Sequence, residues 1–264
     1  MIFRRDKKRK GSAEEEPDEV VEVEEVEEVE ADATDKPAAG PAEEDDLAAL
    51  DALDWRGAGP WDVNEVDDLD GTEQAPKIDL GSLIITGVPG SELRLQVAEE
   101  TKEIVSAMFV IETTVPAPAG QPAQTQTVSS ALELGAYAAP RSGGLWAELR
   151  EEISEAATAQ GGSASLREGP FGVELYRFIP VTTPEGEQGY QPSRMWVAEG
   201  PRWLLRGIVY GQAAVEDDVE SPVVADVLAA FRQVVVRRGE EAMAPGDLLP
   251  LSMPSTVAAG DEPE

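Results

Sequence analysis

Residues 221–239 read Ser-Pro-Val-Val-Ala-Asp-Val-Leu-Ala-Ala-Phe-Arg-Gln-Val-Val-Val-Arg-Arg-Gly, the clearest helix signal in the sequence. Ser221 is a good N-cap, and Pro222 suits the first helical position because its missing N–H is not needed there. Apolar residues recur every three or four positions as far as Val235. The two arginines before the closing glycine suit the negative end of a helix dipole. The stretch therefore predicts one amphipathic helix that ends at Arg238.

A second helix is predicted upstream, where apolar side chains from Leu145 to Ala157 share one face, glutamates cover the other, and Gly161 ends the pattern. Most other apolar runs alternate with polar residues or are rich in β-branched residues, as strands are. The strand candidates are residues 83–85, 93–97, 104–114, 125–138, 164–167, 173–179, 194–198 and 203–210. Because strands and helices are segregated along the chain, we expect an α+β domain with a mainly antiparallel sheet and two principal helices.

The charge is distributed unevenly along the 264 residues, which carry 53 acidic and 21 basic side chains for a net charge of −32. Residues 1–76 hold 26 acids and 8 bases. A segment so one-signed repels itself and lacks apolar area to offset chain entropy, so we predict a disordered acidic tail and linker with a basic start at residues 4–10. The predicted domain spans residues 77–239, and residues 240–264 are expected to form an extended C-terminal segment.

Within the tail, one stretch has a different pattern. Residues 45–55 space leucines near one helical face, place acids at the start and end on Trp55. This stretch is either a short helix that docks into a groove of a partner or a linker with incidental leucines.

Histidine and cysteine are both absent, which removes many catalytic classes. Without them the chain has no imidazole base, no thiol nucleophile, and no ordinary zinc, haem or iron–sulfur ligand set. Residues 68–72 match the DxDGT nucleophile motif of haloacid-dehalogenase-type phosphatases, but no apolar strand precedes them, so we interpret the match as chance in an Asp-rich linker. The sequence therefore predicts a protein that is not an enzyme, with no catalytic, cofactor-binding or metal-binding residue.

Location and partners follow from the same composition. The basic start leads directly into acidic residues rather than into an apolar core of a signal peptide, and no apolar run is long enough to span a membrane. We therefore expect a cytoplasmic protein with no membrane span. A net charge of −32 repels polyanions, so direct nucleic-acid binding is not expected.

Arginine and aromatic residues lie close together in the strands between residues 176 and 206. The predicted domain and the residues after it up to 253 hold 11 Arg but only 2 Lys. Guanidinium groups beside aromatic rings clamp carboxylates or phosphates and stack on bases. The alternative is that the rings pack inward while the arginines face solvent or pair with the many glutamates. The weak ligand-contact candidates are Arg177, Arg194, Trp196, Arg202, Trp203 and Arg206.

Two functional hypotheses follow. The first is a non-enzymatic interaction protein whose acidic tail engages an unknown, basic protein partner through electrostatic steering. The alternative is a small-ligand or nucleotide-binding domain that uses the Arg/aromatic strands around residues 176–206. Neither hypothesis requires a cofactor.

Five further blocks of the sequence are Gly-Pro-Trp-Asp at 59–62, Lys-Ile-Asp-Leu-Gly-Ser-Leu at 77–83, Gly-Pro-Phe-Gly at 169–172, Gly-Pro-Arg-Trp-Leu-Leu-Arg-Gly at 200–207 and Arg-Arg-Gly-Glu-Glu-Ala-Met-Ala-Pro at 237–245. Together these blocks resemble an uncharacterised actinobacterial family that is catalogued as a domain of unknown function. The resemblance covers about residues 55–253 and implies no catalytic or ligand residue, because none is established for that family.

Overall fold

A computed structural model describes residues 44–73, 75–117, 124–183 and 186–254. The predicted disorder of the first 43 residues, the basic start at 4–10 and the last ten residues of the predicted C-terminal segment lie outside these ranges. Among the described residues, no helix is both long and apolar enough to cross a membrane.

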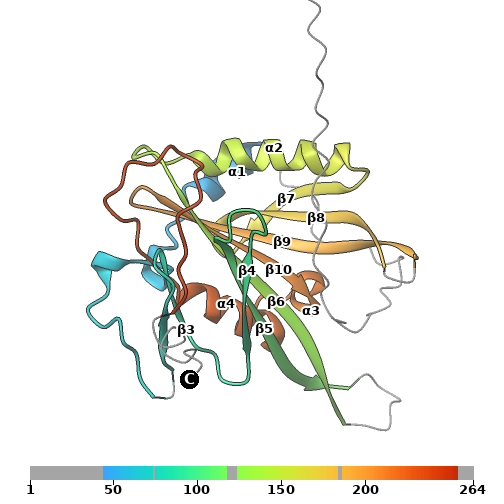
Figure 1. The fold of residues 1–264 in the computed structure, drawn as a ribbon. Helices are drawn as coiled ribbons and strands as arrows, with labels where there is room; N and C mark the ends of the chain where they lie inside the picture. The colour runs from blue at the N-terminus through green and yellow to red at the C-terminus, as the bar shows by residue number, and fades with distance from the viewer. Residues whose placement is uncertain (1–43, 74, 118–123, 184–185, 255–264) are drawn as a thin grey trace, which may run out of the picture. The chain divides into compact units, whose positions relative to one another are not determined.

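The main element is a seven-stranded sheet in which every neighbouring pair of strands is antiparallel (Figure 1). Its strand order is β4-β5-β6-β10-β9-β8-β7. Its strands are β4 (Glu92–Val97), β5 (Ile104–Pro116), β6 (Thr125–Ala138), β7 (Ser163–Gly169), β8 (Gly172–Thr182), β9 (Gln188–Gly200) and β10 (Trp203–Gly211).

A smaller sheet has the order β1-β11-β3-β2, in which only β1 and β11 run parallel among the described pairs. Its strands are β1 (Trp61–Asp62), β2 (Lys77–Asp79), β3 (Leu83–Thr86) and β11 (Val235–Val236). The helical elements are α1 (Glu44–Asp51), the 3-10 turns η1 (Arg56–Ala58) and η2 (Val63–Glu65), α2 (Leu145–Ala159), α3 (Gln212–Val215) and α4 (Pro222–Arg232). The predicted α+β class, mainly antiparallel sheet and two principal helices, α2 and α4, are confirmed.

Helices cover both faces of the large sheet. In Figure 1, α2 lies along the top of the view over β7 and β8, whereas α3 and α4 lie against the other side of the sheet. We call the two sides the α2 face and the α4 face. Strand alternation sends neighbouring side chains to opposite faces, and two hydrophobic clusters result. The α4-face cluster holds the large, fully buried rings of Phe109, Trp196, Trp203 and Phe231.

Helix α4 is shorter than the sequence predicted. Ser221 caps it as expected, with its Oγ accepting a hydrogen bond from the backbone N–H of Val224 at 3.4 Å, but the helix ends at Arg232. The prediction that the helix continues to Arg238 is wrong, because Val235 and Val236 form β11 and pair with strands on both sides. β-Branched residues favour a strand where neighbouring edges are available, and local periodicity does not reveal those edges.

The two arginines after α4 form hydrogen bonds to other parts of the domain, one to the small sheet and one to the β9–β10 turn. Arg237 makes two hydrogen bonds of 2.9 Å to the carboxylate of Asp79 and one of 2.7 Å to the carbonyl oxygen of Gly81. Arg238 donates to the carbonyl oxygen of Arg202 at 3.1 Å. Both side chains therefore link the end of α4 to other parts of the domain.

Ordered elements begin before residue 77, where the sequence prediction placed the domain boundary. Helix α1 lies against β8, and a Cβ added to Gly172 would come within 2.4 Å of the carbonyl oxygen of Leu50. Asp51 accepts hydrogen bonds of 2.6 and 2.9 Å from Arg150 of α2. Residues 45–55, predicted as a docking helix or a linker, thus hold a helix that packs on the domain of its own chain. A tail that is acidic overall still contains apolar side chains that the domain buries.

The segment after Gly239 runs across the ends of both sheets. Leu248 forms an isolated bridge with Tyr137, and Leu251 forms bridges with Gly81 and Ile104. Leu249 is fully buried. Leu249 and Leu251 therefore join the α4-face cluster, whereas most other residues of 240–254 are exposed and form no helix or strand.

Candidate functional site

The six candidate residues predicted from the sequence do not form one cluster. The pairing of β8, β9 and β10 divides them between the two faces of the large sheet. The α4 face holds Arg194, Trp196 and Trp203; the α2 face holds Arg177 and Arg206; and Arg202 lies in the turn between β9 and β10.

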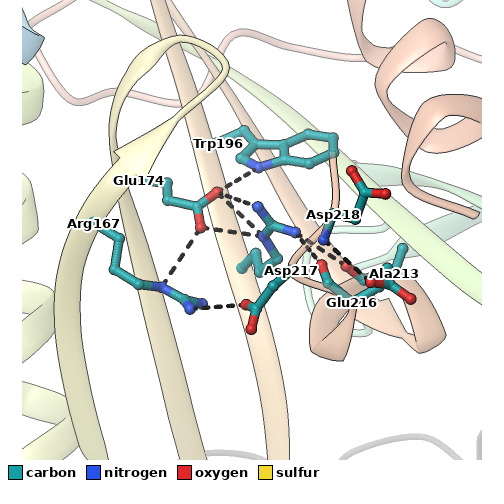
Figure 2. A network of polar contacts seen from close by, with 8 residues as sticks. Arg167, Glu174, Trp196, Ala213, Glu216, Asp217 and Asp218 are labelled. Atoms are coloured by element: carbon teal, nitrogen blue, oxygen red, sulfur yellow. Dashed lines mark hydrogen bonds and ion pairs between the residues drawn. The ribbon is translucent and has the colours of Figure 1, made fainter. Parts of the chain in front are cut away.

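On the α4 face, a buried carboxylate organises a closed network (Figure 2). Glu174 of β8 is 2 % exposed and accepts hydrogen bonds from Arg194 Nε at 3.2 Å and Nη2 at 3.1 Å. Its Oε2 also accepts from the indole N–H of Trp196 at 2.9 Å. Figure 2 shows these groups converging on the carboxylate from the neighbouring strand. Sequence reasoning did not single out Glu174, because the residue opposite an arginine depends on strand register.

The same network fixes the chain that follows β10. Arg194 donates from Nη1 to the carbonyl oxygen of Glu216 at 2.8 Å. Arg167 of β7 contacts Glu174 at 3.7 Å, pairs with Asp217 at 3.3 Å and stacks 3.7 Å above the ring of Tyr176. Two arginines thus face two carboxylates, so the charges balance and the network holds α3 against the sheet.

Trp203 and Arg202 also have structural partners. The indole N–H of Trp203 donates to Asp62 at 2.8 Å, and both side chains are buried. The carbonyl oxygen of Arg202 accepts from Ala139 at 3.0 Å and from Arg238 at 3.1 Å. Arg202 has a positive φ of 65°, as the tight turn requires. These contacts stabilise the β9–β10 hairpin, and neither residue lines the two cavities described below.

On the α2 face, a groove lies between α2 and the sheet. It has a volume of 210 Å³ and is largely apolar. Three residues of α2, four of the sheet and one of the C-terminal segment line it, namely Trp146, Leu149, Ile153, Tyr137, Val197, Leu204, Arg206 and Gly246. We call this cavity the Arg206 groove, because Arg206 is its one charged lining residue.

Arg206 joins the groove to a polar patch on the same face. Its guanidinium carbon lies 5.0 Å from the centre of the Tyr137 ring, and its Nη2 lies 3.8 Å from Glu133 Oε1. The phenol of Tyr210 donates to Glu133 Oε2 at 3.3 Å. Burial raises the pKa of Tyr210, and the nearby Glu133 raises it further. Both phenols of the patch remain protonated at neutral pH, since burial raises the pKa of Tyr137 as well.

Arg177 is the second cation of this patch. It donates to Ser193 Oγ at 3.3 Å and makes no ion pair with a carboxylate among the described residues. Burial lowers the pKa of its guanidinium, and the charge of Arg206 lowers it further. Arg177 and Arg206 therefore lie on the same face of the large sheet, on β8 and β10, and Glu133 contacts Arg206.

The DxDGT match at residues 68–72 forms a turn rather than a catalytic loop. The DxDGT carboxylate Asp68 accepts hydrogen bonds from the backbone N–H groups of Asp70 at 3.0 Å and Gly71 at 3.3 Å, which lower its pKa. It therefore forms a turn and does not follow a buried strand. The described ranges contain no group of three or more carboxylates placed to hold a metal ion.

A larger cavity of 360 Å³ lies against the small sheet, and two of its three charged lining residues, Glu65 and Lys77, have partners in the domain. Glu65 pairs with Arg56 and accepts from the backbone N–H of Asp62 at 2.7 Å. Lys77 donates to the carbonyl oxygen of Asp68.

Sequence reasoning missed Glu133, Tyr137 and Tyr210. Alternation within residues 125–138 puts Glu133 and Tyr137 on one face of a strand. Their meeting with Arg206 depends on the pairing of β6 with β10, which local patterns do not encode.

Comparison with known proteins identifies the family of the chain. A model of the family described as "Protein of unknown function (DUF3710)" matches residues 59–260, and the chain belongs to that family. Searches found no significant match among curated proteins and none among solved structures. The matched range includes β1, the Arg206 groove and the arginine patch. The actinobacterial origin predicted from the sequence stays a prediction.

Proposed function

We propose that this protein is a non-enzymatic binding protein whose domain takes an apolar group of its ligand or partner in the Arg206 groove. One observation carries the proposal. Arg206 lines an apolar cavity and has Glu133, at 3.8 Å, as its one ion-pair partner among the described residues, on a protein whose net charge is −32. The chain has 53 acidic side chains that could neutralise its arginines. Beside the groove, only Glu133 pairs with Arg206 among the described residues.

The dimensions and composition of the groove support binding rather than catalysis. Its 210 Å³ is below the roughly 300–1,000 Å³ of pockets for drug-sized ligands, so it suits one ring or one branched aliphatic group. The chain has no histidine or cysteine, and the one carboxylate of the patch already holds Tyr210 and contacts Arg206. Acid–base catalysis usually needs a positioned pair of groups with separated pKa values.

The test is a nuclear magnetic resonance titration of the full chain with small ring compounds. The indole N–H of Trp146, which donates to the carbonyl oxygen of Val173 at 2.8 Å, reports on the groove wall. We expect a saturable shift of the Trp146 signal, while the signals of Trp196 and Trp203 in the opposite cluster stay in place. The substitution Leu204→Trp should fill the groove and abolish the shift. Titrations that leave Trp146 unmoved, or that move all indole signals equally, would contradict the proposal.

A second candidate function involves the acidic segment and is favoured by its charge. Residues 1–76 hold 26 acids and 8 bases, which suits steering toward a basic protein surface. The test uses poly-L-lysine as a defined basic probe and compares the full chain with a variant that lacks residues 12–43. The deletion stops at residue 43 because α1 and Trp55 pack on the domain. We expect binding that weakens steeply between about 0.05 and 0.5 M salt and that the deletion reduces. Equal binding by both chains would contradict it. The cytoplasmic location predicted from the sequence stays a prediction.

A further inference from the structure

We infer that the partner of the Arg206 groove is a basic segment of a polypeptide, which places one apolar side chain in the groove and its flanking lysines or arginines on acidic residues beside it. This inference rests on the proposed function and adds the chemistry of the partner. Two segments of the chain border the groove, helix α2 and the C-terminal segment around Gly246. Both of these segments are acidic.

Helix α2 presents carboxylates beside the groove. Its exposed glutamates are Glu148, Glu151, Glu152 and Glu155. The one base of the helix, Arg150, already pairs with Asp51. Leu149 lines the groove, and residues three or four positions apart are neighbours on a helix surface. Glu152 therefore lies next to the groove, and Glu148 lies one turn away from Glu152 on the same flank.

The C-terminal segment adds carboxylates where Gly246 lines the groove. Residues 240–247 contain three acids, Glu240, Glu241 and Asp247, and all three are exposed. With the flanking Arg141 and Arg238 counted beside Arg150, the two bordering segments hold seven acids against three bases. None of the seven acids forms an ion pair with any base in the described ranges. The surroundings of the groove therefore attract cations.

The spacing of the glutamates makes α2 favour a basic partner further. Glu148 and Glu152 lie four positions apart, as do Glu151 and Glu155, and like charges at this spacing destabilise a helix. A cation bound between them removes this repulsion, whereas an anion increases it. Inside the groove, Arg206 contacts Glu133 at 3.8 Å, so these two charges offset each other and the apolar lining is left for an apolar side chain. Charge complementarity thus selects a basic partner with an apolar anchor.

The length of the acidic border selects a polypeptide over a small cation. Glu148 and Glu155 are separated by about 10 Å along the helix axis, at 1.5 Å per residue. The groove itself, at 210 Å³, holds one ring or one branched group. An extended chain advances about 3.3 Å per residue, so residues two positions before and after the anchor lie about 7 Å to either side of it. One polypeptide segment therefore fills the groove and reaches several carboxylates, whereas a small amine reaches one.

The experiment measures the affinity of the full chain for three peptides, with the Trp146 indole signal as the readout. The first is acetyl-Lys-Lys-Phe-Lys-Lys-amide, the second replaces its phenylalanine by glycine, and the third replaces its four lysines by glutamates. Trp146 lines the groove, so its signal separates binding there from attraction of lysines to the acidic residues 1–76. We expect the first peptide to bind at least about tenfold more tightly than either of the others, because it alone combines a buried ring with cations.

Substitution of the glutamates tests where the cations bind. The double variant Glu148→Gln with Glu152→Gln should bind the basic phenylalanine peptide about fivefold more weakly, as the loss of two exposed ion pairs implies. The matched control is Glu99→Gln with Glu100→Gln, the same charge change at two exposed residues after β4, and it should leave the affinity unchanged. Equal weakening in both double variants would show that only the net charge attracts the peptide, and would overturn the inference.

The remaining outcomes separate this inference from the proposed function. Equal affinity for the lysine and glutamate peptides would overturn the basic partner, and 2-phenylethylamine binding as tightly as the lysine peptide would assign a small amine instead of a polypeptide. In both cases a saturable shift of Trp146 leaves the groove proposal standing. Equal binding of the phenylalanine and glycine peptides would contradict the apolar anchor. If neither the peptides nor the small ring compounds move the Trp146 signal, the inference and the proposed function are both wrong.

Discussion

The two faces of the large sheet use the same residue types to opposite effect. On the α4 face, the side chains of Arg194 and Glu174 are 5 % and 3 % exposed and lie 3.1 Å apart. On the α2 face, the side chains of Arg206 and Glu133 are 28 % and 15 % exposed and lie 3.8 Å apart. Full burial requires a charge to be paired and hydrogen-bonded, whereas partial exposure lets water supply the missing partners. The difference separates a pair that is closed inside the fold from a pair that remains partly exposed to solvent.

Removing one carboxylate from each face tests this difference most strongly. Glu174→Gln leaves Arg194 and Arg167 buried without their shared carboxylate. Breaking a buried pair in this way typically costs about 3–5 kcal/mol. We expect the free energy of unfolding, measured by urea denaturation, to fall by about that amount.

The matched control is Glu133→Gln on the α2 face. Because Arg206 is partly exposed, we expect this substitution to lower the free energy of unfolding by less than about 1 kcal/mol. Similar losses for the two variants would show that the faces do not differ in the way described.

Replacing the arginines by lysine sharpens the comparison while keeping the charge. Arg194 donates to both Glu174 and the carbonyl oxygen of Glu216, which one ammonium group does not reproduce. We expect Arg194→Lys to cost about 2 kcal/mol of unfolding free energy. Arg206→Lys should cost about 0.5 kcal/mol, mostly from the weakened contact with the Tyr137 ring. A larger loss at Arg206 than at Arg194 would reverse the assignment.

The sequence predicts the fold well where periodicity alone decides the structure. Strand alternation and the two amphipathic helices are local properties, and they lead correctly to an α+β domain with a mainly antiparallel sheet. Local sequence does not determine where α4 ends. Val235 and Val236 form a strand instead of continuing the helix because β1 and β3 lie on either side to pair with them. The packing of residues 44–73 is hard to predict for a related reason, because the acidic composition of this segment outweighs the few apolar side chains, such as the partly buried Trp55, that pack against the core.

The candidate site is harder to predict from sequence. Alternation places Arg177 and its neighbour Tyr176 on opposite faces, but it does not say which arginine has a buried partner. Glu174 meets Arg194 through the β8–β9 register, and Glu133 meets Arg206 through the β6–β10 pairing. Both ion pairs depend on which strands are neighbours in the sheet, and residue patterns within one strand do not contain that information.

Helix α1 connects the two faces at the edge formed by β7 and β8. Asp51 pairs with Arg150 of α2, and Trp55 lies 6.0 Å from Phe171 of the α4-face cluster. Asp51→Asn removes the charge from a pair in which Arg150 is largely buried, and we expect a loss of about 1 kcal/mol. Amide hydrogen exchange should then be faster in α1 but not in β9 or β10. Asp46→Asn, an exposed residue of the same helix, is the control, and equal acceleration in both variants would contradict the role of the pair.

The smallest expected effect on the free energy of unfolding comes from tyrosine ionisation. It allows the two faces to be compared at alkaline pH. Burial raises the pKa of Tyr176 on the α4 face and of Tyr137 and Tyr210 on the α2 face. These phenols release protons in the unfolded chain near pH 10 but hold them in the folded state. The stabilisation is therefore complete below the unfolded pKa and is lost as the pH rises toward the folded pKa.

The free energy of unfolding should fall between about pH 9.5 and 10.5 as the tyrosines of the unfolded chain ionise. In Tyr210→Phe this fall should be smaller by about 0.5 kcal/mol, because one buried phenol with a raised pKa is removed. It should also remove the part of the 295-nm phenolate absorbance that appears only at the highest pH. Tyr190→Phe, a change at a 63 % exposed tyrosine, is the control. If Tyr210→Phe leaves both curves unchanged, Tyr210 is not held protonated by burial beside Glu133, and the α2 face is more open to water than its geometry implies.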